Sequence, residues 1–191
     1  MPNSREQNMN FGNGIRLIEG SFSSLEQYYL KVFSDFDAFS PNVCDGLQKR
    51  IVIFPTDSYH LSETQFCALS RAINEVDDGS FFISELGWRE DSFHKGRHYR
   101  CHRPSFDMYT ALPIGVENAI YGKNGLWGVV ISDELHAILA CNNSFFEVFR
   151  QGYPAFDDDL RQFGEYWKEV EQRGISIDWF DSFCSRLSYD A

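Results

Sequence analysis

The sequence contains none of the short motifs that mark the common catalytic sites. It has no Gly-x-Ser-x-Gly nucleophile turn, no His-Glu-x-x-His zinc motif, no Walker A loop and no Gly-x-Gly-x-x-Gly turn in its 191 residues. The adjacent pair Cys101-His102 is weak evidence for catalysis, because catalytic partners are usually distant in sequence. The sequence therefore favours a non-catalytic protein over an enzyme, and it predicts no catalytic residue and no cofactor.

Long apolar runs and an export signal are also missing. No apolar stretch approaches the length of about 18 residues that spans a bilayer. The polar, Asn-rich start, residues 1–13, has neither the basic nor the apolar region of a secretory signal. The five cysteines are scattered singly, which favours reduced thiols. We therefore expect a cytoplasmic protein without a membrane partner.

Basic residues are scarce. The chain has 17 Lys and Arg against 28 Asp and Glu, a formal net charge of −11. Nucleic acids are bound through clustered cations, so this excess of acid argues against a nucleic-acid partner. It permits a basic protein partner, and nothing in the pattern specifies an oligomeric state.

Apolar residues make up 43% of the chain and include 18 Phe, enough for a packed core. We predict a flexible head, residues 1–14, followed by a single α+β domain, residues 15–191, with a mostly antiparallel sheet and flanking helices. The spacing of apolar residues predicts strands at 50–54, 80–86, 126–131 and 135–141, the last two as a hairpin. It predicts helices at 25–36, 62–76, 144–152 and 157–173, followed by an amphipathic segment at 175–187 that packs through its aromatic residues.

Two capping boxes mark expected helix starts. Ser62 with Gln65, flanked by Leu61 and Phe66, has both a capping box and a hydrophobic staple, and residues 144–147 repeat the box. Residues 88–113 are rich in charged residues, Gly and Pro. We expect them to form an exposed loop segment that ends in a strand at 105–110.

Residues 94–103 gather three of the five histidines, one cysteine and four of the cations. His94, His98 and His102 are spaced by four residues, which places them on one face of either a helix or a strand. With Cys101 they form a candidate metal site, since imidazole and thiolate are ligands that Zn²⁺ prefers. Such a site would make the chain a metal-dependent enzyme, the alternative to a binding protein. The interleaved cations oppose a metal ion, and a solvated basic loop or an internal ion-pair hub explains the same residues.

The same segment offers an anion-binding site. Arg97, Arg100 and Arg103, backed by Tyr99, have the guanidinium groups that clamp phosphates or carboxylates. The alternative is that these arginines pair with the protein's own surplus of acids.

A third candidate surface is the outer face of the helix expected at 157–173. It carries Asp158, Glu165, Glu169 and Glu171, and such a face suits docking of a basic protein. Solvation of the helix explains the same residues without a partner. The three aspartates at its start are typical of a helix N-terminus rather than of a metal site.

Residues 125–137 read GLWGVVISDELHA and are followed by Phe145, Phe146 and Phe149. This Trp-Gly strand, Ser-Asp-Glu turn and Phe-bearing helix resemble the immunity-type accessory proteins of bacterial toxin systems. The second strand departs from that pattern, because residues 140–142 are Ala-Cys-Asn where small glycines are expected. The resemblance covers only residues 125–149. It implies a non-catalytic, acidic protein that neutralises a basic toxin domain, often a nuclease.

Overall fold

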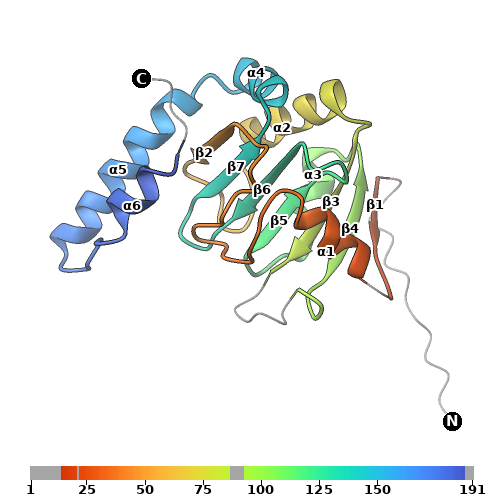
Figure 1. Cartoon of the computed structure of the whole chain (residues 1–191), viewed down its shortest axis with the longest axis horizontal. Coiled ribbons are helices and arrows are strands. Elements are labelled where there is room, and N and C mark those ends of the chain that lie inside the picture. The colour runs from red at the N-terminus through yellow and green to blue at the C-terminus, as the bar shows by residue number, and fades with distance from the viewer. Residues whose placement is uncertain (1–13, 21, 87–92, 188–191) are drawn as a thin grey trace, which may run out of the picture.

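Seven strands form one sheet in which all neighbouring strands are antiparallel (Figure 1). The computed structural model describes residues 14–20, 22–86 and 93–187. The strand order is β1-β4-β3-β5-β6-β7-β2, which leaves β1 and β2 at the edges. The strands are β1 (Ile15–Leu17), β2 (Lys49–Ile53), β3 (Ser80–Glu85), β4 (His98–His102), β5 (Asn118–Tyr121), β6 (Trp127–Ile131) and β7 (Ala137–Cys141).

The described parts of the chain also form six helices, which cover both faces of the sheet (Figure 1). They are α1 (Ser23–Tyr29), α2 (Glu63–Val76), α3 (Phe106–Thr110), α4 (Asn143–Gly152), α5 (Phe156–Gln172) and α6 (Phe180–Cys184). The predicted single α+β domain with a mostly antiparallel sheet is confirmed. Within these residues, no helix combines the length and the apolar character needed to cross a membrane.

Side chains alternate along the strands and divide the core between the two faces. On one face, α2, α3 and α4 pack against the sheet and form the largest apolar cluster; Phe66 of α2 and Phe145 of α4 are both buried in it. On the other face, Tyr29 of α1 packs near Tyr121, while Phe163 of α5 packs near Val52 beside the β2 edge. The two ends of this second face are therefore covered by different helices.

The helix starts show how far local pattern predicts local structure. Ser62 and Gln65 form the predicted capping box, and the backbone N–H of Ser62 donates to Gln65 Oε1 at 2.9 Å. The second predicted box is wrong, because α4 begins earlier and Asn142 Oδ1 accepts from the N–H of Phe145. A side-chain amide at the N-cap position serves as well as a hydroxyl.

Three predictions of secondary structure need correction. The strand expected at 105–110 is the helix α3, capped by Ser105. The helix expected at 25–36 ends at Tyr29, and the apolar residues Val32 and Phe33 continue as irregular buried chain. Part of the segment expected to be an exposed loop is the inner strand β4.

The strands β1 and β5 were not predicted. With three and four residues, they are too short to show an alternating pattern of apolar residues. All of the predicted flexible head except Gly14 lies outside the described residues.

Candidate functional site

The pleat of β4 separates the residues of the predicted metal site. His98 and His102 lie on one face of the strand, and Cys101 lies on the other, in the main apolar core. His94 precedes the strand, and its Nε2 lies 3.4 Å from Glu26 Oε2 of α1. Within the described chain, no group of three or more His, Cys, Asp or Glu side chains is arranged to hold a metal ion. The four residues do not converge on a common site.

His98 has a structural role that uses both ring nitrogens. It is fully buried, with Nε2 2.7 Å from the carbonyl oxygen of Phe93 and Nδ1 2.7 Å from Ser84 Oγ. Because a carbonyl oxygen only accepts, Nε2 carries the proton and Nδ1 of the neutral ring accepts from Ser84. Burial lowers the pKa of His98, which favours this neutral form. The ring therefore has no nitrogen left for a metal.

The three predicted anion-binding arginines are also separated. Arg97 is held by Glu85 of β3: its Nε lies 3.0 Å and its Nη2 2.6 Å from Glu85 Oε1. Arg103 lies in the turn after β4 with a φ of 46°, and its backbone N–H donates to the carbonyl of Gly79. Arg100 lies within β4 and is exposed. The alternative of internal ion pairing thus holds for Arg97, and the predicted triad is not assembled.

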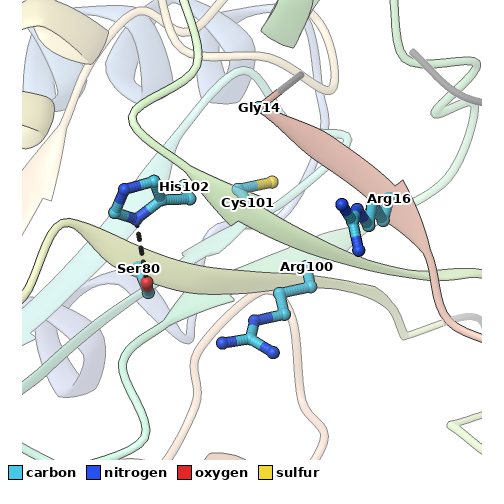
Figure 2. Close-up of a pocket in the computed structure, with 6 residues that line it drawn as sticks. All are labelled: Gly14, Arg16, Ser80, Arg100, Cys101 and His102. Atoms are coloured by element: carbon cyan, nitrogen blue, oxygen red, sulfur yellow. Dashed lines mark hydrogen bonds between the residues drawn. The ribbon is translucent and has the colours of Figure 1, made fainter. Parts of the chain in front are cut away.

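Arg16 of β1 does lie beside Arg100. The two are direct partners in the antiparallel β1–β4 register. Farther along β4, His102 faces Ser80 of β3, and Ser80 Oγ lies 3.1 Å from His102 Nδ1. These side chains line an open hollow of about 430 Å³. Figure 2 shows the residues that line it. We call this hollow the basic groove; its lining residues are Gly14, Arg16, Ser80, Arg100, Cys101 and His102, of which Cys101 has its side chain buried on the opposite face of β4.

Three of the four acidic residues predicted to bind a partner on α5, which we call the α5 row, form ion pairs with arginines of this chain. Asp158, Glu165 and Glu169 lie on the same side of the helix. Successive residues of a helix are rotated by about 100° around its axis, so Glu171, two residues after Glu169, points to nearly the opposite side. Arg161 pairs with both Asp158, at 3.2 Å, and Glu165, at 2.9 Å. Arg173 lies 3.8 Å from Glu169. These exposed pairs are weak, but they reduce the negative charge that the row presents.

A second acidic surface forms no ion pair within 4 Å among the described residues, although Arg50 lies close enough to one of its acids, Asp37, to interact with it. Burial, followed by the charge of Asp133, raises the pKa of Glu117 to about 7, and Asp37 adds to the effect. Burial and then Asp133 also raise the pKa of Glu134. These carboxylates come from the loop after α1, the start of β5 and the β6–β7 turn. Sequence reasoning missed this cluster because only the fold brings those segments together.

An exposed leucine lies within the same acidic surface. Leu135 follows Glu134 in the β6–β7 turn, is 37% exposed, and has a left-handed φ of 59°. A branched apolar residue in this conformation carries strain that Gly or Asn avoids. We call Asp37, Glu117, Asp133, Glu134 and Leu135 the acidic turn surface.

No protein-family model matches the chain, and no curated protein sequence or solved structure shows significant similarity to it.

Proposed function

We propose that this chain is a non-catalytic binding protein of the immunity type, which engages a basic protein through the acidic turn surface. The observation that carries the proposal is the exposed, strained Leu135, which directly follows Asp133 and Glu134 in the β6–β7 turn. Exposed apolar residues at the centre of a charged rim are typical of protein interfaces. Backbone strain persists where the surrounding structure or function maintains it.

Charge supports the same proposal. A basic partner would relieve the mutual repulsion that helps to raise the pKa of Glu117. The net charge of −11 would accelerate encounter with such a partner and disfavour acidic competitors. The Ser-Asp-Glu turn also belongs to the segment that resembles immunity-type proteins. The α5 row, Asp158, Glu165, Glu169 and Glu171, is an auxiliary contact in this proposal, because three of its acids, Asp158, Glu165 and Glu169, already have cations nearby.

The test is affinity capture from the native host on the immobilised chain, eluted with a salt gradient, followed by binding kinetics with the purified partner. The test variant combines Asp133→Asn, Glu134→Gln and Leu135→Asn, since Asn adopts the left-handed conformation of position 135 readily. The matched control, Glu63→Gln with Asp181→Asn and Leu30→Asn, makes the same kinds of change elsewhere on the surface.

We expect one basic protein to be retained by the wild type and the control and to be released by moderate salt, because exposed charges are screened. The test variant should bind it at least about tenfold more weakly. Equal binding by all three chains would refute the acidic turn surface. Failure to retain any basic protein would refute the function.

A further inference from the structure

Two positive charges lie directly opposite each other at the β1 edge of the sheet. Arg16 of β1 and Arg100 of β4 are register partners, and both are exposed on the same face. Directly opposed like charges destabilise an antiparallel pair, because their side chains start only about 5 Å apart. In a chain with a large excess of acid, this arrangement calls for a counter-charge.

The described part of the chain does not supply that counter-charge. Arg71, Arg97, Arg150, Arg161 and Arg173 all form ion pairs with carboxylates. Neither Arg16 nor Arg100 has such a partner among the described residues. The acid nearest in sequence to Ser80, Asp78, is bound to Lys123 at 2.9 Å. The basic groove therefore keeps its positive charge in an otherwise acidic molecule.

The remaining lining groups are suited to an oxyanion. The bond from Ser80 fixes the ring of His102 through Nδ1, and Nε2 has no hydrogen-bond partner within the described chain. Figure 2 shows His102 and the two arginines along the same stretch of sheet, on three adjacent strands with Ser80. Two guanidinium groups and one imidazole provide several donors, a set that matches the tetrahedral oxygens of phosphate.

We propose that Arg16, Arg100 and His102 bind a phosphate group, carried by a small phosphate monoester or as the free ion. A hollow of about 430 Å³ is in the size range of small-ligand sites. A nucleic acid is disfavoured, because its extended phosphate backbone would meet the acidic remainder of the surface. The site lies apart from the acidic turn surface and does not depend on the function proposed above.

The test is titration calorimetry of the full chain at low ionic strength, with inorganic phosphate and with glycerol 3-phosphate. The test variant is Arg16→Gln with Arg100→Gln. The control, Arg71→Gln with Arg173→Gln, removes the same net charge from arginines that already have carboxylate partners. Circular dichroism verifies that each variant folds, and imidazole NMR signals of the wild-type chain report His102 independently of any variant.

We expect wild type and control to bind at least one of the two ligands with a dissociation constant of about 1 mM. The test variant should bind it at least about tenfold more weakly. Tighter binding of glycerol 3-phosphate than of phosphate assigns the site to a monoester, and equal binding assigns it to the free ion. No heat and no His102 shift with either ligand up to about 10 mM would overturn the proposal. Equal binding by the test variant would also overturn it.

Discussion

The backbone N–H of Phe54 donates a hydrogen bond to Asp159 Oδ2 at 2.9 Å, across a sequence separation of 105 residues. This bond joins the first turn of α5 to the chain just after β2. Tyr153 OH donates to the same carboxylate at 3.1 and 3.2 Å, and Gln65 Nε2 reaches Tyr153 OH from α2. Asp159 is 1% exposed, so a residue expected only to favour a helix start joins α5 to the residues that follow β2 and α4, and through Tyr153 to α2.

Asp159 gives the first prediction. Burial raises its pKa to about 6, so the folded state binds a proton more tightly than the unfolded chain. Its contribution to stability is therefore complete below about pH 4 and is lost as the pH rises through about 6. We expect the free energy of unfolding to change with pH by on the order of 2 kcal/mol less in Asp159→Asn than in the wild type. Urea unfolding between pH 4 and 7 measures it.

Asp158→Asn is the matched control for that experiment, because the neighbouring carboxylate is exposed and bound to Arg161. Its unfolding free energy should follow the wild-type pH profile. A wild-type pH profile for Asp159→Asn would contradict the proposed protonation.

The second prediction concerns the ion pair of Arg97 and Glu85. The Glu85 side chain is only 8% exposed, so removing its partner leaves a nearly buried carboxylate with fewer donors. We expect Arg97→Gln to lower the free energy of unfolding by about 1–3 kcal/mol. Arg71→Gln, which breaks an exposed pair with Glu75, should change it by less than about 0.5 kcal/mol. Equal effects in chemical denaturation would rule out a special role for the Glu85 pair.

The third prediction concerns Glu117. Its pKa is raised to about 7 first by burial and then by the charge of Asp133. Asp133→Asn should therefore lower the pKa of Glu117, yet leave it above the ordinary value near 4.5, because burial persists. NMR titration of the Glu117 side-chain carboxyl carbon measures both values. A midpoint unchanged by the substitution would show that the two carboxylates do not interact.

The fourth prediction contrasts two glycines. A Cβ at Gly128 of β6 would lie 2.8 Å from Phe33 Cε2 and 2.9 Å from Val32 Cγ1, so Gly128→Ala overpacks the core. We expect a loss of about 1–3 kcal/mol. A Cβ at Gly164, inside α5, would meet only Phe180 Cζ at 3.6 Å. Gly164→Ala should stabilise by about 0.5–1 kcal/mol through helix propensity. Thermal unfolding of both variants tests the difference, and the same sign for both would contradict it.

Local sequence determined the elements whose residues interact over short distances. Ser62 and Gln65 specify the start of α2 because both partners of the capping box lie within one helical turn. The apolar runs on either side of the β6–β7 turn specify a hairpin for the same reason. The apolar stripe of α5 predicted its buried face, including Phe163 and Trp167.

Only the tertiary structure decided which charged and polar groups meet. His98 and Cys101 are separated because their segment is a strand, whose alternate residues face opposite sides. Arg16 meets Arg100 because a three-residue strand pairs with β4, and no local pattern reveals that register. Periodicity and capping record interactions within a few residues. The basic groove and the acidic turn surface depend on strand pairing and loop packing between distant segments, which the chain specifies only as a whole.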